Sequence, residues 1–427
     1  MGKVAESYFN RYIEKIIERK LKSSGAILVA GPKFCGKTTT STLFANSIYR
    51  LNTTTIISNT KLNPKLALVG ETPHLIDEWQ KAPDIWNYVK EDLDINYRFG
   101  AYILTGSSTP VDKTKIQHSG AGRITPLKMY TMSLYESEDS KGLVSLSQLF
   151  KYRKTDIVDP NLNYTLEETA FLICRGGWPL AIKKEKDIAL DITKNYYSGL
   201  FYFNDDNSEI FRNKKPEIFK LILKSYARNI STEASLKTMI NDVKGENERT
   251  IDEKTFNEYL NALKDLYIIE DMEAWRPNIR SKTSIISTPT RHFVDTSIAC
   301  QALGLSPNDL INDFNSFGLF FEDMAIRDLR IYSLLLDGTV KHYRDNAGLE
   351  CDAIIHLSNG KWGAIEIKLG GDELIEIGAK KLNILKKKIK EKSDYVEPTF
   401  MMILTAFGPL YTREDGIIVV PINLLRD

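Results

Sequence analysis

Features that would mark a special class of protein are scarce in this sequence. Its 427 residues include four cysteines, Cys35, Cys174, Cys300 and Cys351, which lie far apart and lack the paired spacing of metal ligands. A zinc site or a disulfide framework is therefore not expected, and free thiols fit a reducing cytoplasm. The apolar runs are much shorter than the roughly 20 residues of a membrane span, and residues 1–22 lack the apolar centre of a signal peptide. We expect a soluble, cytoplasmic protein without membrane contact.

An excess of charge of one sign is also lacking. The chain has 57 Lys and Arg residues against 56 Asp and Glu residues, a formal net charge of +1. Because nucleic-acid-binding domains usually show a basic face, any contact with DNA must be local. The hydrophobic fraction of 42% and the charged fraction of 26% are ordinary for a folded protein. Since the chain is longer than one core usually organises, we expect several domains.

Short apolar stretches alternate with helical patterns in the first third of the chain. Strands are expected at Ala26–Ala30, Thr54–Ser58, His74–Ile76 and Ala101–Thr105, after a helix at Tyr8–Leu21. This alternation predicts an α/β fold with a parallel sheet covered by helices.

A glycine-rich segment, GPKFCGKT at 31–38, follows the first strand and precedes a helix expected to carry Leu43 and Phe44. It fits the P-loop pattern G-x-x-x-x-G-K-[ST]. Backbone N–H groups of such a loop surround a β-phosphate. We expect Lys37 to neutralise the β- and γ-phosphates and Thr38 to bind Mg²⁺, so ATP and Mg²⁺ are the predicted cofactors. The predicted nucleotide-binding residues are Gly31, Pro32, Lys33, Phe34, Cys35, Gly36, Lys37, Thr38 and Thr39.

Two adjacent carboxylates end a later strand. Asp77 and Glu78 follow the apolar run at His74–Ile76, 39 positions beyond Thr38. In this context Asp77 is expected to bind Mg²⁺ and Glu78 to orient the attacking water. The sequence therefore predicts hydrolysis of ATP, with Lys37, Asp77 and Glu78 in catalytic roles.

Three further polar residues are candidates for contacts with the γ-phosphate, and each also has a structural alternative or a stronger rival. Thr105, within LTGSS at 104–108, is either a γ-phosphate sensor or a helix cap. Arg123 is either an arginine finger, acting in its own subunit or in a neighbour's, or part of a structural salt bridge. Arg175, beside two glycines, is a weaker candidate for the same finger.

Together these motifs resemble a known family. The segments LIDEWQ at 75–80, LTGS at 104–107, GAGRI at 120–124 and MSLYE at 132–136 are similar to prokaryotic AAA-type ATPases that carry a C-terminal domain of unknown function. The resemblance covers nearly the whole chain, since ARN at 227–229, TEAS at 232–235 and IEIK at 365–368 also match. It implies an AAA ATPase core, a winged-helix segment and a nuclease-like end. The biological role of that family is poorly defined.

The middle of the chain is predicted to be helical. A lid is expected over 146–195, and three helices, Glu217–Asn229, Glu233–Val243 and Lys254–Leu266, then precede a strand at Tyr267–Trp275. Three helices and a hairpin predict a winged helix. Acidic residues on its recognition helix oppose phosphate binding, so the module suits a protein partner equally well. The better basic patch consists of Arg276, Arg280, Lys282 and Arg291.

The last part of the chain combines a helix at Phe320–Leu335 with strands at Val340–Arg344, Asp352–Leu357 and Trp362–Lys368. Asp352, Glu366 and Lys368 show the D…E-x-K spacing of the restriction-endonuclease-like PD-(D/E)xK fold. Positions 366 and 368 share one face of a strand, so Asp352 and Glu366 are expected to hold Mg²⁺ and Lys368 to activate water. Glu322 is expected to complete the metal site. The alternative is an inactive domain whose charges serve the structure.

A lysine-rich helix is expected at Glu376–Lys392. Its charged face suits sequence-independent phosphate contacts or is simply a solvated surface.

The predicted division of the chain has four parts. They are a P-loop ATPase core at 1–140, a helical lid at 141–205, a winged-helix-like segment at 206–300 and a nuclease-like α/β domain at 301–427. The leading hypothesis is an ATPase whose nucleotide state controls DNA binding or cleavage by the last domain. The alternative is a signalling or defence switch with an inactive nuclease-like scaffold, and a third is a DNA-binding regulator. Homo-oligomers or a protein partner are expected through the middle domain.

Overall fold

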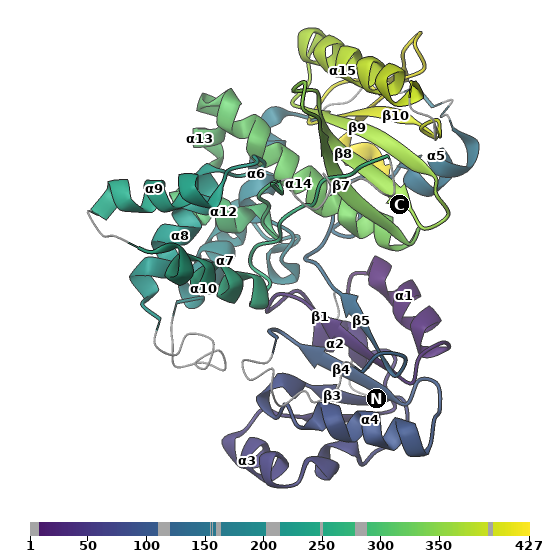
Figure 1. The fold of residues 1–427 in the computed structure, drawn as a ribbon, viewed down its shortest axis with the longest axis vertical. Coiled ribbons are helices and arrows are strands. Elements are labelled where there is room, and N and C mark those ends of the chain that lie inside the picture. Colours follow the sequence, from purple (N-terminus) through teal and green to yellow (C-terminus); the bar gives the residue numbers. More distant parts are fainter. Residues whose placement is uncertain are drawn as a thin grey trace. The chain divides into compact units, whose positions relative to one another are not determined.

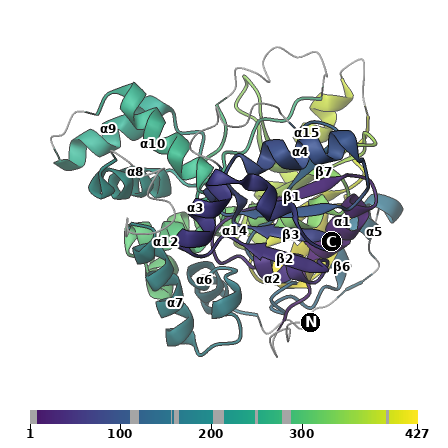
Figure 2. The ribbon, with the colours of Figure 1, turned by 90° about the horizontal axis from the view of Figure 1, so that it is seen from below.

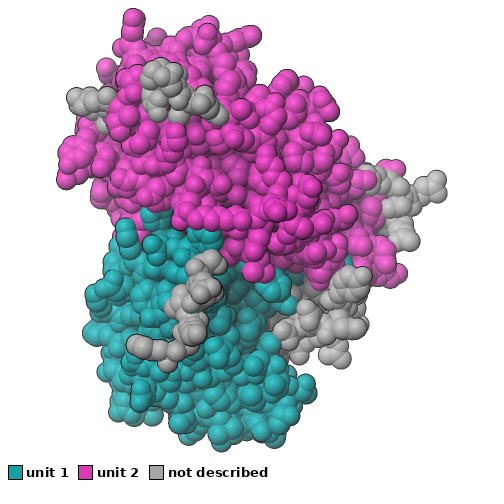
Figure 3. Space-filling view, turned by 180° about the vertical axis from the view of Figure 1, so that it is seen from behind, with its two compact units in different colours: residues 1–131, 201–214, 261–268 teal, residues 132–200, 215–260, 269–427 magenta. Residues whose placement is uncertain are grey.

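The computed structural model describes residues 8–109, 120–153, 155, 157–158, 164–201, 214–247, 251–277, 288–391 and 396–427. The chain divides into two compact units (Figure 3). Unit 1 consists of residues 1–131 with the segments 201–214 and 261–268, and unit 2 consists of the remainder. Each unit has its own sheet, and each is described by itself.

Unit 1 is built on a five-stranded parallel sheet with the order β2-β3-β4-β1-β5 (Figures 1 and 2). Strand β4 lies between β1 and β3, so the carboxyl ends of these three strands lie side by side. This confirms the parallel sheet predicted from the alternating pattern. The strands are β1 (Ala26–Ala30), β2 (Ser47–Arg50), β3 (His74–Asp77), β4 (Tyr102–Gly106) and β5 (Ile124–Lys128).

Helices cover this sheet. They are α1 (Tyr12–Leu21), α2 (Lys37–Thr42), α3 (Thr54–Leu62) and α4 (Ile85–Ile95), with the short 3-10 helices η1 (Pro64–Leu68) and η2 (Trp79–Lys81). Trp79 and Trp86 pack together with ring centroids 5.1 Å apart and join the buried core between the sheet and α4. Burial of such large apolar surfaces is the main stabilising contribution in this unit.

The strand predicted at Thr54–Ser58 was wrong, because this segment forms α3. The run of β-branched residues favours a strand by propensity alone. In the structure, Thr53 caps the helix by accepting a hydrogen bond from the backbone N–H of Ile56 at 3.3 Å, and Ile56 and Ile57 pack on the Trp79 core. The tertiary contacts therefore override the propensity, and the edge strand is β2 instead.

Two helix boundaries in unit 1 also differ from the prediction. Helix α1 begins at Tyr12 rather than Tyr8, because the Glu14 carboxylate accepts the backbone N–H of Arg11 and caps the helix there. Helix α2 ends at Thr42, before Leu43 and Phe44.

Unit 2 begins with helices from the predicted lid and winged-helix segments. They are α5 (Leu146–Tyr152), α6 (Leu166–Arg175), α7 (Lys186–Gly199), α8 (Pro216–Arg228), α9 (Leu236–Asn247) and α10 (Glu253–Asp265), with η4 (Pro179–Ala181). The last residues of α10 group with unit 1. A continuous strand predicted at Tyr267–Trp275 was wrong. This segment forms only isolated bridges, two antiparallel ones from Ile269 to Phe293 and from Met272 to Thr290, and a parallel one from Ala274 to His342.

The C-terminal part of unit 2 contains a mixed six-stranded sheet with the order β11-β12-β10-β9-β8-β7 (Figure 1). Its strands are β7 (Gly338–Arg344), β8 (Glu350–Leu357), β9 (Trp362–Lys368), β10 (Met401–Thr405), β11 (Tyr411–Thr412) and β12 (Ile418–Pro421). The helices are α12 (Thr296–Leu303), α13 (Pro307–Asn312), α14 (Phe314–Leu334) and α15 (Asp372–Lys390). The chain then forms the 3-10 helix η5 (Ile422–Leu424) and the short strand β13 (Leu425–Arg426). Strand β13 pairs with β6 (Val144–Ser145).

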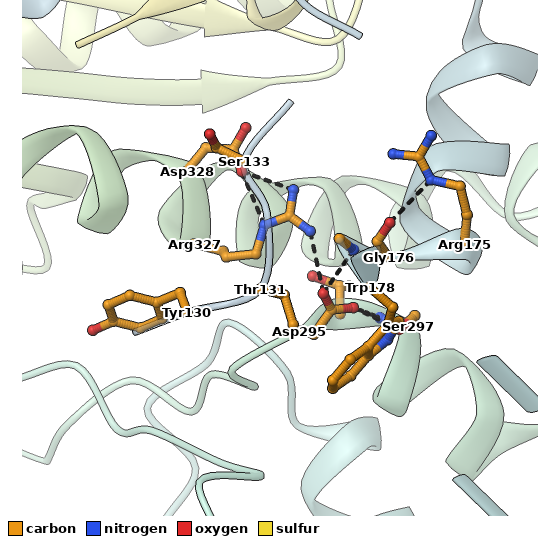
Figure 4. A network of polar contacts seen from close by, with 12 residues as sticks. Tyr130, Thr131, Ser133, Arg175, Gly176, Trp178, Asp295, Ser297, Arg327 and Asp328 are labelled. Carbon is orange, nitrogen blue, oxygen red and sulfur yellow. Dashed lines mark hydrogen bonds and ion pairs between the residues drawn. The ribbon is translucent and has the colours of Figure 1, made fainter. Parts of the chain in front are cut away.

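Helix α14 carries a buried ion network (Figure 4). The Arg327 guanidinium lies 2.7 Å from the Asp328 carboxylate and 3.4 Å from that of Asp295. The Asp295 carboxylate also accepts a hydrogen bond from the backbone N–H of Gly177 at 2.8 Å. The Asp328 carboxylate accepts one from the backbone N–H of Leu134 at 2.9 Å. Burial makes an unpaired charge costly, so this network fixes α14 against the segments around Leu134 and Gly177.

All four cysteines are buried and free. None of the helices in the described part of the chain is both long and apolar enough to cross a membrane.

Candidate nucleotide site and a second charged cluster

The phosphate-binding loop connects β1 to α2 in unit 1. Its path needs left-handed backbone at two positions, Phe34 with φ 62° and Gly36 with φ 102°. Gly31 passes so close to the segment after β5 that a Cβ atom there would lie 2.0 Å from the Met129 carbonyl oxygen. Glycine at 31 and 36 is therefore required by the backbone itself.

Lys37 lies inside this loop. Its ammonium donates to the carbonyl oxygens of Gly31 at 2.9 Å and Pro32 at 2.7 Å, and the side chain is buried. The loop's own backbone thus holds the cation beside the loop N–H groups, where an anionic phosphate is attracted. Cys35 is buried against Met129, whereas Phe34 and Thr39 are exposed and Lys33 is half-buried.

Three predicted residues from three elements meet at one carboxylate oxygen. The Thr38 hydroxyl donates to Asp77 Oδ1 at 2.7 Å, and the Thr105 hydroxyl donates to the same oxygen at 2.5 Å. The strand order explains the meeting, since β4 lies between β1 and β3. The sequence prediction for Thr38, Asp77 and Thr105 therefore falls on one connected site.

Glu78 adjoins this cluster in a left-handed conformation with φ 61°. Its backbone N–H donates to Thr105 Oγ1 at 3.3 Å. Its carboxylate accepts Gln80 Nε2 at 2.6 Å and the Ser107 hydroxyl at 3.2 Å. Sequence reasoning gave Gln80 no role of its own. Its position two residues after an acidic strand end is the signal that could have marked it as a carboxylate holder.

The donor set fits Mg-nucleotide. A P-loop typically provides one hydroxyl and one carboxylate to Mg²⁺, and the phosphates and water supply the other ligands. Thr38 and Asp77 are placed as such a pair. Among the described residues no group of three or more His, Cys, Asp or Glu side chains is arranged to hold a metal ion.

Arg123 lies at the end of the sheet opposite to the P-loop. Ile124, its neighbour, pairs with Ala26 at the amino end of β1, whereas the P-loop follows the carboxyl end. Arg123 Nε donates to Asp94 at 2.7 Å, and the guanidinium lies 5.7 Å from the Tyr97 ring centroid. The structure therefore does not bring Arg123 to the nucleotide site of its own chain, which contradicts a finger acting in its own subunit. A finger acting in a neighbouring subunit stays a prediction.

Arg175 is buried in unit 2 and forms two hydrogen bonds to the Asp139 carboxylate, at 3.2 and 2.7 Å. This pairing gives it a structural role in the described arrangement.

A second charged cluster lies on β8 and β9 in unit 2. The Lys368 ammonium is 2.7 Å from Asp352 and 2.9 Å from Glu366. Asp352 also accepts the backbone N–H of Ile367 at 2.7 Å. The structure thus brings together the three residues that the D…E-x-K spacing singled out.

Burial and neighbouring charges together set the protonation of this cluster. The pKa of Glu366 is raised to about 7, first by burial and then by the negative charge of Asp352, against the attraction of Lys368 and Lys381. Burial opposes the charge on Lys368, but the carboxylates of Asp352 and Glu366 outweigh it and raise its pKa above the usual range. Lys368 therefore stays a cation and neutralises the carboxylates.

Glu322 reaches this cluster from α14. Burial, followed by the charge of Asp352, raises the pKa of Glu322 well above its usual value, which favours the protonated acid. From α15, Lys381 lies 3.7 Å from Glu366, a contact that sequence reasoning missed. The signal was Gly378 in the middle of the helix, where an added Cβ would touch the Glu366 side chain at 3.4 Å.

Several cations of the two predicted basic patches, the one around Arg276 and the lysine-rich helix α15, form ion pairs. Arg291 is buried and pairs with Asp271 at 3.0 Å, so its assignment to an exposed patch was wrong. On α15, Lys386 pairs with Glu397 at 3.0 Å and Lys388 with Asp345 at 2.5 Å. Arg280, Lys282 and Lys392 lie outside the described residues.

The sheet order, the P-loop and the shared Asp77 contacts define a P-loop nucleotide-binding domain, and residues 23–138 match the family model of the AAA domain. Two other family models match further along the chain, at 166–309 and 317–425. Both are described as domains of unknown function.

Two relatives match over most of the chain at low identity. Two uncharacterized proteins, one from Mycobacterium bovis and one from Mycobacterium tuberculosis, are each 22% identical over 358 residues, covering 82% of this chain and 72% of theirs.

Solved structures show only weak likeness. A Walker-type ATPase of Pyrococcus abyssi matches at 14% identity with a TM-score of 0.43, covering 70% of this chain and 97% of that one. The replication initiator DnaA bound to AMPPCP and single-stranded DNA matches at 12% identity with a TM-score of 0.27, covering 60% and 89%.

Proposed function

We propose that this protein binds Mg-ATP and hydrolyses it. The observation that carries the proposal is the convergence of Thr38 and Thr105 on Asp77, directly beside the loop that holds Lys37. A hydroxyl, a carboxylate and a lysine around backbone N–H groups are the set that a nucleotide triphosphate and its metal require.

Each residue has a separate task in this proposal. The loop N–H groups and Lys37 bind the phosphate oxygens, while Thr38 and Asp77 bind Mg²⁺, which spreads the charge of the transferring phosphoryl group. Glu78 orients the attacking water. Gln80 and Ser107 hold one oxygen of its carboxylate at 2.6 and 3.2 Å, so the side chain is directed before water arrives.

The test is ATP binding and turnover by the full chain. Lys37→Ala is expected to abolish binding of Mg-ATP, whereas Glu78→Gln should bind it normally and lose about 100-fold or more in turnover. Lys22→Ala, which removes an exposed lysine directly after α1, is the control and should match the wild type. Tight binding by Lys37→Ala, or wild-type turnover by Glu78→Gln, would contradict the proposal.

A second proposal concerns the charged cluster on β8 and β9. We propose that the C-terminal part of unit 2 is a nuclease-like domain that binds or cleaves DNA under control of the nucleotide state. Asp352, Glu366 and Lys368 share one face of two adjacent strands, and Glu322 faces them from α14. A winged helix formed by α8–α10 would present the DNA or a protein partner.

One observation favours the alternative, a switch with an inactive scaffold. Lys368 contacts both carboxylates that would otherwise bind a metal, so Mg²⁺ would have to displace an ammonium. The deciding measurement is cleavage of plasmid, linear and branched DNA with Mg²⁺ or Mn²⁺, with and without ATP. Cleavage that is lost in Asp352→Ala and altered in Lys37→Ala supports the nuclease, while ATP turnover without cleavage of any substrate supports the switch.

A further inference from the structure

Arg11 connects two parts of unit 1 that are distant in sequence. It precedes α1, and its guanidinium is buried. Nη1 donates to the carbonyl oxygen of Cys35 at 2.8 Å, and Nη2 donates to those of Tyr130 at 2.9 Å and Thr131 at 3.1 Å. One side chain thus holds the phosphate-binding loop and the chain segment that leaves β5.

Neighbouring residues fix Arg11 in place. The Glu14 carboxylate accepts the backbone N–H of Arg11 at 2.5 Å and the Tyr8 hydroxyl at 2.7 Å. The same Tyr8 hydroxyl lies 3.1 Å from Thr40 Oγ1 on α2. The N-terminal segment therefore contacts the chain on both sides of Lys37, at Cys35 and at Thr40.

The segment after β5 is also packed directly against the loop. The backbone N–H of Met129 donates to Ala30 at 2.8 Å, and the Met129 carbonyl oxygen is 3.7 Å from Cys35 Sγ. The closeness of Gly31 to Met129 leaves no room even for a methyl group. Close-packed groups transmit displacement, so a shift of the loop displaces residues 129–131.

The same segment continues into unit 2 after a single peptide bond. The backbone N–H of Met132 donates to Gly177 at 2.7 Å, and that of Leu134 donates to Asp328 on α14 at 2.9 Å. The first half of the segment 129–134 is thus held by the nucleotide loop and Arg11, and its second half by the buried network of unit 2.

We propose that Arg11 is a positioning residue that couples the conformation of the phosphate-binding loop to the segment 129–134, and through it to α14. This inference rests on the nucleotide binding proposed above. A planar guanidinium with several N–H donors can serve three carbonyls in different directions, whereas an ammonium lacks this fixed geometry. Arg11 contacts no reacting atom in this proposal, and its effect is transmitted through Cys35.

The experiment is hydrogen exchange of the full chain with and without Mg-AMPPNP, after binding of that nucleotide has been measured directly. In the wild type, the nucleotide is expected to change exchange in the segment 129–134 by about tenfold. In Arg11→Lys, binding should weaken by no more than about tenfold, while the nucleotide-dependent change in 129–134 is lost. Arg19→Lys, at an exposed position on α1, should behave as the wild type.

The readout separates coupling from a structural role. A residue that only stabilises the fold would raise exchange equally with and without nucleotide, and the difference would persist. A wild-type-like change in Arg11→Lys, or no change in the wild type despite measured binding, would overturn the inference. Absence of nucleotide binding in the wild type would instead refute the proposed function.

Unfolding of Arg11→Lys, detected by circular dichroism, would call for Glu14→Ala, which removes the acceptor of the Arg11 backbone N–H. This variant keeps the guanidinium and loosens the backbone that carries it. It should reduce the change in 129–134, and an undiminished change would equally overturn the inference.

Discussion

At the scale of single residues, buried charges and dipoles set the behaviour of this protein. His342 on β7 is an example: its pKa is lowered to about 4, first by burial and then by electrostatic repulsion from His292, Arg276 and Arg344. The Glu233 carboxylate lies 3.4 Å from Nδ1 of its ring. The folded chain therefore holds His342 as the neutral form well below the pH at which an unfolded chain would protonate it.

This depressed pKa predicts a loss of stability in acid. Stability from the neutral ring is fully present above the unfolded pKa of 6.5 and is lost as the pH falls toward 4. Between pH 7.5 and 5 the wild type should lose about 2 kcal/mol more than His342→Gln. Urea unfolding of both proteins at the two pH values measures this difference.

The control for this prediction is Lys341→Gln on the same strand, which removes an ion pair with Glu273. A lysine does not titrate in this window, so the control should show the wild-type pH dependence. Equal acid losses in the wild type and His342→Gln would show that His342 is not held neutral.

At the scale of elements, α14 is held by a buried ion network. Arg327 neutralises Asp328 and Asp295, which in turn hold Leu134 and Gly177. Arg327→Met should lower the free energy of unfolding of unit 2 by about 3–5 kcal/mol, because two buried carboxylates lose their cation. Denaturant unfolding monitored by tryptophan fluorescence measures the loss, and Trp178, whose indole donates to Ser297 near this network, contributes to the signal.

Arg413→Met is the matched control for Arg327→Met. Arg413 pairs with Glu376, whose side chain is 53% exposed, and a surface pair contributes only about 0–1 kcal/mol. Similar losses in the two variants would mean that the Arg327 network adds nothing beyond a surface ion pair.

The elements also show what the sequence could and could not predict. The strands at Ala26–Ala30 and Trp362–Lys368 were predicted to the residue, because short apolar runs beside glycine or charged motifs leave few alternatives. The error at Thr54–Ser58 arose because one cap at Thr53 and contacts with Trp79 decide between helix and strand. Neither is visible in local propensity.

The residues of the candidate site also divide into those that the sequence reveals and those that it does not. The P-loop, Asp77 and Thr105 could be found because each ends a strand in a recognisable pattern, and a parallel sheet brings such ends together. Arg11 could not, since its partners are backbone carbonyls of distant segments. Gln80 and Lys381 were missed because the signals that mark them, the spacing from Glu78 and the glycine at 378, are weak without the structure. Arg123 was misplaced because a sequence does not show which edge of the sheet a loop occupies.

At the scale of the whole molecule, two separate cores predict two unfolding transitions. Mg-AMPPNP at about 100 times its Kd should stabilise unit 1 by about 2.7 kcal/mol, since only the folded unit binds it. Calorimetry should show one transition moving more than the other, with no shift in Lys37→Ala and an intact shift in Asp352→Ala. A single transition that moves as a whole would show that the units unfold together.

The rates at which the buried cysteines react report which unit opens. Cys35 belongs to unit 1, and Cys174, Cys300 and Cys351 belong to unit 2. A thiol is alkylated only when it is exposed as a thiolate, so each cysteine reacts at the rate at which its surroundings open. Mass spectrometry after brief alkylation would therefore time the opening of the nucleotide loop and of three sites in the second core within one unmodified chain.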